Sequence, residues 1–197
     1  MSSAIRLARH SDARAIADIY RPIVAATAIS FETEPPDAEE MRRRIGDTLP
    51  FYPWLVCERG HEIAGYAYAT RHRVRAGYRW SIDTSVYVLP AHHRCGVGRG
   101  LYSSLFAILT AQGFVNAFAG IALPNPASVA MHERMGFQPI GIYRNVGYKL
   151  GQWHDVGWWQ LTLQPATATV SPPLDLASVR ASREWEQLLG AGVSMLR

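Results

Sequence analysis

Residues 80–113, WSIDTSVYVLPAHHRCGVGRGLYSSLFAILTAQG, place a strand, a glycine-rich loop and a helix in direct succession. Side chains alternate between two faces from Trp80 to Val88, which predicts a strand. The polar face of that strand carries Ser81, Asp83, Ser85 and Tyr87. After the loop, apolar residues recur at helical spacing and Gly113 suits the end of a helix. This succession indicates an α/β domain.

The flanking sequence adds the remaining elements of one domain. Strands are predicted at Ile5–Ala8, Trp54–Glu58, Ile63–Thr70, Asn116–Ala122, near Ile140–Tyr143 and at Asp155–Leu163. Helices are predicted from an N-cap at Ser11 to about Ala25, after a capping box of Asp37 and Glu40, and at about Ala127–Met135. The strand pair around residue 60 makes the sheet mixed, so we expect a mixed α/β sheet flanked by helices.

The C-terminal part of the chain has a different composition. Residues 165–173 are rich in Pro, Ala, Thr and Ser, which predicts a linker between a domain at 1–164 and an extension at 174–197. A single C-terminal helix is predicted from apolar residues at helical spacing, namely Leu174, Ala177, Ala181, Trp185 and Leu188. Since this stripe needs cover, we expect the helix to pack on its own domain or on a partner subunit.

Composition excludes several classes of protein. Of the 197 residues 48% are hydrophobic, enough for a core, and no run approaches the roughly 20 apolar residues of a membrane span. The first residues lack the apolar segment of an export signal, so a cytoplasmic location without membrane association is expected. Two cysteines supply neither a disulfide framework nor a four-ligand zinc site. A net charge of +4 permits a small anionic ligand without requiring nucleic acid.

The loop Arg94–Gly100 is the strongest single motif. Glycines let a ligand approach the backbone, and a helix N-terminus presents unpaired N–H groups to a phosphate. The loop lacks the GxxxxGK[ST] pattern, and Leu101 stands where a dinucleotide fingerprint has its third glycine. By itself the motif leaves open a simple glycine-rich turn before a helix.

Seven segments in fixed order make the loop more specific. They are SFETEPP (30–36), YPWLV (52–56), SVYVLP (85–90), GVGRGLY (96–102), AQGF (111–114), LPNPASVAMHERMGF (123–137) and GQWHDVGWWQL (151–161). This order resembles the acetyl-CoA-binding core of the GNAT N-acetyltransferases. More narrowly, it is similar to the phosphinothricin N-acetyltransferase family, which also acetylates methionine sulfoximine and methionine sulfone. The resemblance covers about residues 5–163 and leaves the tail outside.

The resemblance implies the GNAT fold with a twisted mixed sheet, a homodimer, acetyl-CoA as co-substrate and no metal. The cofactor-binding residues it implies are Val86, Tyr87, Val88, Arg94, Cys95, Gly96, Val97, Gly98, Arg99, Asn125 and Ser128. Among these, the amide of Val88 would stabilise the oxyanion of the thioester under attack. One departure is His93, where the superfamily usually has Arg or Gln, so phosphate binding would rest on backbone groups.

Two residues are candidates for proton transfer by the same resemblance. Asp83 stands where the family commonly has the Glu that takes the proton from the amine; being shorter, it would act directly or through a water. The alternative is a solvated carboxylate or an ion pair with an arginine of the 71–79 loop. His132 would protonate the departing thiolate, and its alternative is a purely structural histidine.

The substrate site is implied at the basic loop that precedes the strand. Arg73, Val74 and Arg75 would meet an acidic substrate, with Phe31 as a wall; a solvated loop is the alternative. The predicted function is acetylation of a small acidic amino-acid analogue. Open alternatives are another amine (a polyamine, an aminoglycoside or a protein amine) and a non-catalytic module that binds acyl-CoA.

Overall fold

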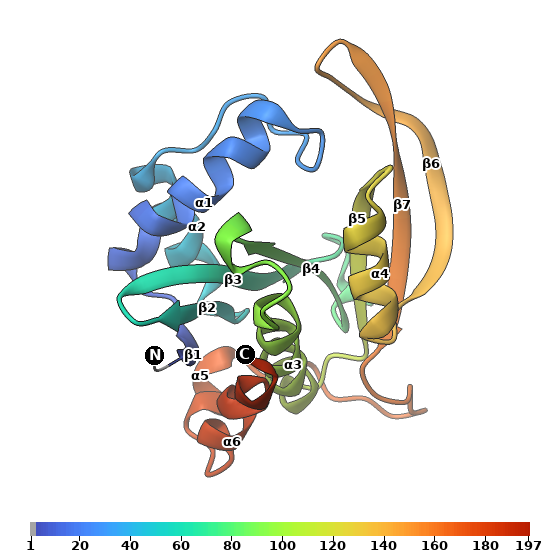
Figure 1. The fold of residues 1–197 in the computed structure, drawn as a ribbon. Helices are drawn as coiled ribbons and strands as arrows, with labels where there is room; N and C mark the ends of the chain where they lie inside the picture. The colour runs from blue at the N-terminus through green and yellow to red at the C-terminus, as the bar shows by residue number, and fades with distance from the viewer. Residues whose placement is uncertain (1–2) are drawn as a thin grey trace.

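The computed structural model describes residues 3–197 and contains a seven-stranded mixed sheet flanked by helices (Figure 1). The strand order is β1-β2-β3-β4-β5-β7-β6, and all neighbours are antiparallel except β4 and β5. The strands are β1 Ser3–Leu7, β2 Trp54–Arg59, β3 Glu62–Arg71, β4 Ser81–Val88, β5 Asn116–Leu123, β6 Gln138–Lys149 and β7 Gln152–Thr162. The predicted mixed α/β fold is confirmed.

Helices cover both faces of the sheet. They are α1 Ala13–Ala26, α2 Ala38–Thr48, α3 Val97–Gln112, α4 Pro126–Arg134, α5 Leu176–Arg180 and α6 Trp185–Gly190. Alternate residues of β3 supply two separate cores: Tyr66 packs with α1 and α2, and Ala67 packs with α3. The same alternation on β4 buries Ile82 on the α3 face and directs Asp83 to the opposite face.

The two parallel strands pair only at their beginnings. Ser81–Asp83 of β4 pair with Asn116–Phe118 of β5, after which β4 follows β3 and β5 follows β7 (Figure 1). The strands therefore diverge beyond the pair formed by Asp83 and Phe118. We call that pair the apex of the cleft between β4 and β5.

The start of α1 differs from the prediction. Ser11 is not the N-cap; it lies in a short 3₁₀ turn, and Asp12 is the cap residue. The Asp12 carboxylate accepts from the Arg9 N–H at 2.7 Å and pairs with Arg6 at 2.7 Å, which holds the turn. At α2, Asp37 accepts from the Glu40 N–H at 2.8 Å, which confirms the predicted cap.

The last two strands form an antiparallel hairpin, the β6–β7 arm (residues 138–162). β6 is much longer than predicted, whereas β7 begins three residues earlier and ends one residue earlier than predicted. A bulge after Tyr143 interrupts the register, and Asn145, at φ 48°, donates its N–H to Asp155 at 2.8 Å. The bulge and the exposure of most of β6 remove the two-residue alternation that marks a strand in sequence.

The C-terminal extension packs on its own domain, against α3 (Figure 1). The predicted single helix was wrong, because two short helices flank a turn around Ser182. The buried side chains are consequently Leu176, Val179 and Trp185, whereas Leu174 is exposed. Ser104 of α3 donates to the Leu189 carbonyl at 2.7 Å and accepts from the Gly192 N–H at 3.1 Å, which fixes the extension to the helix.

Candidate active site

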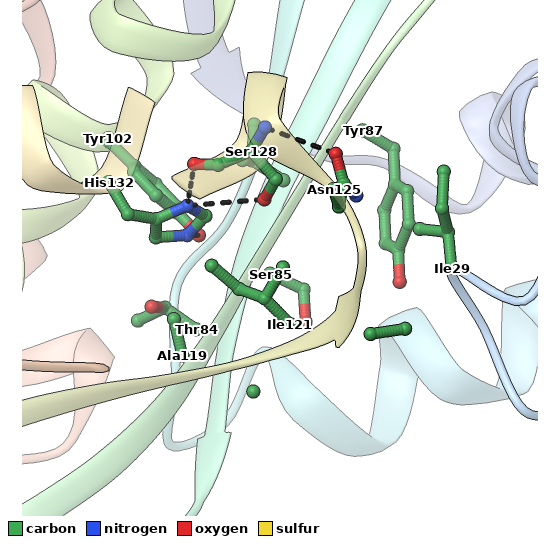
Figure 2. Close-up of a pocket in the computed structure, with 13 residues that line it drawn as sticks. Ile29, Thr84, Ser85, Tyr87, Tyr102, Ala119, Ile121, Asn125, Ser128 and His132 are labelled. Atoms are coloured by element: carbon green, nitrogen blue, oxygen red, sulfur yellow. Dashed lines mark hydrogen bonds between the residues drawn. The ribbon is translucent and has the colours of Figure 1, made fainter. Parts of the chain in front are cut away.

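A cavity of about 60 Å³ lies where β4 and β5 diverge (Figure 2). Its lining comes from both strands, from α3 and α4, and from the loop between α1 and α2. The lining residues are Ile29, Thr84, Ser85, Val86, Tyr87, Tyr102, Ala119, Gly120, Ile121, Ala122, Asn125, Ser128 and His132. Four predicted cofactor residues, Val86, Tyr87, Asn125 and Ser128, and the predicted acid His132 are thus brought together.

The edge of β4 facing this cleft offers free backbone groups. The N–H of Leu89 donates to Ala64 of β3 at 2.9 Å, so the residues that alternate with it, Val88 and Val86, direct their N–H groups toward the diverging β5. The Val88 carbonyl on the same edge bonds the His93 ring at 3.0 Å. The ring of His93 is therefore hydrogen-bonded to the backbone of β4. The amides of Val86 and Val88 face the space that an extended ligand would occupy.

The glycine-rich loop forms an anion cradle at the start of α3. Arg94 and Gly96 both have positive φ, 61° and 83°, and Gly96 is the N-cap without any side-chain cap. Across residues 3–197, no hydrogen bond caps the N–H groups of Val97, Gly98 or Arg99. A Cβ added at Gly98 would lie 3.1 Å from the Met131 sulfur. Free amides at a helix N-terminus suit a pyrophosphate, while the missing side chain of Gly98 lets Met131 pack closely against the start of α3.

The C-terminal tail lies beside this cradle. The N–H of Arg197 donates to the Cys95 carbonyl at 3.0 Å, and a Cβ at Gly96 would overlap the carbonyl of Met195. Arg59 of β2 also donates to the Arg197 carbonyl. Cys95 and Gly96, which precede α3, therefore lie against the last residues of the chain.

His132 is hydrogen-bonded to Ser128 in the cleft, and these contacts define its tautomer (Figure 2). Its Nδ1 is 2.8 Å from the Ser128 carbonyl, which can only accept, so Nδ1 carries the proton. Nε2, 3.1 Å from the Tyr102 hydroxyl, then accepts from that hydroxyl. Burial lowers the pKa of His132, which keeps the ring neutral at neutral pH. The proton of this hydrogen bond therefore belongs to the Tyr102 hydroxyl. In the sequence, Tyr102 falls among the regularly spaced apolar residues of α3, so the pattern did not distinguish it from a core residue.

Asn125 caps α4. Its side-chain carbonyl accepts from the Ser128 N–H at 3.2 Å, and Pro126 occupies the first helical position (Figure 2). The cap fixes the start of the helix that carries His132. Asn125 therefore shapes the cleft through the backbone it holds.

Asp83 lies at the apex, half-buried, and its partner is a histidine. Its Oδ1 is 2.6 Å from Nδ1 of His72, which answers the choice left open between a solvated carboxylate and an arginine pair. Burial raises the pKa of Asp83, while the hydrogen bond to His72 and the charge of Arg73 act in the opposite direction. Neither composition nor spacing distinguished His72 within the basic loop.

The predicted substrate residues are only partly assembled. Arg73 donates from Nη1 to the carbonyl of His72, the partner of Asp83, at 2.8 Å, and the Arg73 guanidinium lies 5.8 Å from the centre of the Trp158 ring. Phe31 packs instead against Gly147 of the arm, where an added Cβ would lie 2.6 Å from its ring. Val74 is 85% exposed and Arg75 is also exposed.

The loop between α1 and α2 is fixed to the arm above the cleft. Lys149 of β6 donates from its ammonium to the carbonyls of Val24 and Ser30, both at 2.6 Å. This anchor holds Ile29 of the same loop in the cavity wall, a position that carried no signal in the sequence.

Neither a metal-binding cluster nor a membrane-spanning helix is present within residues 3–197. No group of three or more His, Cys, Asp or Glu side chains there is placed to hold a metal ion. No helix in that range has the length and hydropathy to cross a membrane.

Known proteins resemble this chain in sequence and in fold. Residues 5–158 match the family model described as an acetyltransferase (GNAT) domain. The chain is 40% identical to a phosphinothricin N-acetyltransferase of Streptomyces viridochromogenes, covering 79% of this chain and 85% of that protein. It is 35% identical to an L-methionine sulfoximine/L-methionine sulfone acetyltransferase of Salmonella typhimurium, covering 83% and 96% respectively. A crystal structure of a phosphinothricin acetyltransferase from Sinorhizobium meliloti with acetyl-CoA superposes with a TM-score of 0.81 at 32% identity, covering 89% of this chain and 99% of that one.

Proposed function

Because the chain belongs to the GNAT acetyltransferase family and is an acetyl-CoA-dependent N-acetyltransferase, we propose that it acetylates a small acidic amino-acid analogue. The proposed substrates are of the phosphinothricin, methionine sulfoximine or methionine sulfone type. The observation that carries the proposal is the cleft between β4 and β5. It has free amides along one edge, a phosphate cradle at one end and a carboxylate at its apex.

Acetyl-CoA fits this cleft through backbone groups. The amides of Val97, Gly98 and Arg99 would bind the pyrophosphate, and those of Val86 and Val88 would pair with the pantetheine arm as a neighbouring strand does. Pantetheine carries amides of its own, so an unpaired strand edge complements it. The Val88 amide would also stabilise the negative charge that develops on the thioester oxygen.

Proton transfer would take place at the two ends of the reacting bond. An alkyl ammonium must lose a proton before its nitrogen can attack, and the site around Asp83 supplies the base. As the C–S bond breaks, the thiolate needs a proton. His132 and Tyr102 form the donor pair on that side, with the hydroxyl proton between them. The amine nitrogen bonds to the thioester carbon, and the resulting oxyanion then collapses with loss of the thiolate. One ammonium proton leaves through the base to solvent. The second N–H proton, lost as the amide forms, replaces through solvent the proton that the donor pair gives to the thiolate.

Charge around the apex favours a compact acidic substrate. Arg73 sits beside Asp83, and its planar guanidinium suits a carboxylate, phosphinate or sulfone oxygen while disfavouring a polyamine. Thiol release from acetyl-CoA distinguishes this substrate class from the alternative amines, namely a polyamine, an aminoglycoside and a protein amine.

The test is thiol release from acetyl-CoA with a panel of amines. We expect turnover with phosphinothricin, methionine sulfone or methionine sulfoximine and none with spermidine, an aminoglycoside or a lysine peptide. Arg73→Ala should raise KM for the acidic substrate and leave acetyl-CoA binding unchanged, because the guanidinium contacts only the acceptor side. A preference for spermidine or the lysine peptide would refute the substrate class while leaving the acetyltransferase assignment intact.

We also propose that the protein is a homodimer formed through the β6–β7 arm. Seven large apolar side chains of the arm are exposed, which is more than an isolated hairpin normally presents to water. They are Ile140, Ile142, Tyr143, Val146, Tyr148, Leu150 and Trp153. The tail cannot cover them, because it packs on α3.

A further inference from the structure

His72 follows β3 directly and lies at the apex of the cleft. Its ring stacks on Phe118 with centroids 4.3 Å apart and an interplanar angle of 16°. Phe118 is the residue that pairs with Asp83 in the last step before β4 and β5 diverge. The imidazole therefore sits where the two strands separate, and its side chain is only 12% exposed.

The ring is oriented by Asp83. Nδ1 of His72 lies 2.6 Å from Oδ1 of Asp83, and within residues 3–197 Nε2 of His72 has no hydrogen-bond partner. A carboxylate accepts, so the neutral ring carries its proton on Nδ1 and leaves the lone pair of Nε2 free. A carboxylate that holds Nδ1 of a histidine fixes both the tautomer and the ring orientation, so that Nε2 is the atom that can accept a proton.

Within residues 3–197, the rings packed around His72 offer no other base at the apex. Around the ring, Phe118 and Trp158 are uncharged, and the Tyr78 ring lies 6.3 Å away at an angle of 67°. Arg73 is the nearby cation, and its Nη1 donates to the His72 carbonyl at 2.8 Å. The side chain of Asp83 is one methylene shorter than the glutamate common in the family. The imidazole of His72 lies directly beside the Asp83 carboxylate.

We propose that His72 is a catalytic residue whose Nε2 accepts the proton of the substrate ammonium, and that Asp83 is a positioning residue that fixes its tautomer. The inference rests on the proposed acetylation and specifies its base. The proton moves from the ammonium nitrogen to Nε2, and the neutral amine attacks the thioester carbon. His72 then returns the proton to solvent, so the pair is unchanged at the end of the cycle.

The first test compares His72→Gln with His61→Gln, a matched control in the exposed turn between β2 and β3. His72→Gln should lower kcat by roughly 10²–10⁴-fold with the acetyl-CoA dissociation constant unchanged, since a general base contributes about that factor. The acidic limb of its pH–rate profile should change as well. His61→Gln should match the wild type in both. Wild-type kcat and pH profile in His72→Gln would overturn the proposal.

A double variant separates loss of a base from loss of packing. His72→Phe keeps an aromatic ring against Phe118 but lacks Nε2, so its kcat should fall as in His72→Gln. Adding Asp83→Glu should restore part of the rate, because the longer carboxylate reaches the amine itself, and the acidic limb should move to lower pH. Full activity of His72→Phe alone would overturn the proposal.

A third measurement does not depend on turnover. Nitrogen-15 spectra of the histidines should show His72 as the Nδ1–H tautomer in the wild type and a loss of that preference in Asp83→Asn. An Nε2–H tautomer in the wild type would refute the pair. If the wild type acetylated no amine of the panel, the proposed function would fail, and the spectra would still decide whether Asp83 fixes the ring.

Discussion

The contacts of single residues decide the protonation states in the cleft. His132 donates from Nδ1 to a backbone carbonyl and accepts at Nε2 from Tyr102, so both ring nitrogens are satisfied only in the neutral form. Burial also raises the pKa of Tyr102, which keeps its hydroxyl protonated. Tyr102 and His132 therefore form a neutral, hydrogen-bonded pair in the wall of the cleft.

Because the pKa of His132 is lowered in the folded protein, we expect the free energy of unfolding to depend on pH through this residue. The unfolded chain binds a proton at a histidine below about pH 6.5, whereas the folded protein binds it only at lower pH. The contribution of the neutral ring to stability is therefore present above that pH and is lost as the pH falls toward the folded-state pKa. His132→Gln should flatten this part of the curve of unfolding free energy between pH 7 and pH 5, measured by urea denaturation. If the unfolding free energy of His132→Gln changed with pH as steeply as that of the wild type, groups other than His132 would be responsible for the pH dependence.

At the scale of elements, the β6–β7 arm and the loop before α2 form one unit. Lys149 ties the loop to the arm, and Phe31 packs on Gly147. The arm therefore serves two purposes: its inner side holds a wall of the cleft, and its exposed apolar residues remain available to a second copy of the chain.

Charges placed on the exposed arm should separate the dimer. Tyr148 and Trp153 pair across the hairpin and are 60% and 61% exposed. The double variant Tyr148→Glu/Trp153→Glu should be a folded monomer, because four carboxylates would have to leave water in the interface. Light scattering measures the mass, and Phe51→Glu, also at a 61% exposed site, should remain dimeric. A wild-type monomer, or an unchanged mass in the arm variant, would contradict the proposal.

At the scale of the whole molecule, the tail completes the hydrophobic core on the α3 side. Leu176, Val179 and Trp185 join the cluster that contains the inner face of α3. Gly192 packs so closely on Gly100 that a Cβ at Gly192 would overlap the α3 backbone. The tail therefore contributes to the same cooperative unit as the domain, although its sequence lies outside the family resemblance.

Removal of residues 166–197 should cost stability more than chemistry. Each buried aliphatic or aromatic side chain contributes about 1.5–3 kcal/mol, so we expect a loss of several kcal/mol in the free energy of unfolding. Trp185→Ala is the milder variant and should cost about 3–5 kcal/mol by itself. Both should keep kcat at saturating acetyl-CoA, measured by thiol release. A folded truncation without any turnover would place the tail in the catalytic machinery instead.

The sequence by itself determined the β4–loop–α3 unit and the start of α2. The alternation of β4, the positive φ at Gly113 and the Asp37 cap each depend on neighbours a few residues away, so their signals survive in a one-dimensional pattern. The order of motifs likewise determined the family and the location of the glycine-rich loop.

The tertiary structure alone decided which side chains meet. His72 and Asp83 are 11 residues apart and are joined across the β3–β4 hairpin, while Tyr102 and His132 are 30 apart and come from different helices. The divergence of β4 from β5 and the docking of the tail on α3 also depend on register and on packing between distant segments. Such contacts arise from complementary shape and shared burial, which no local spacing records, and they supply the candidate base, the candidate acid and the walls of the cleft.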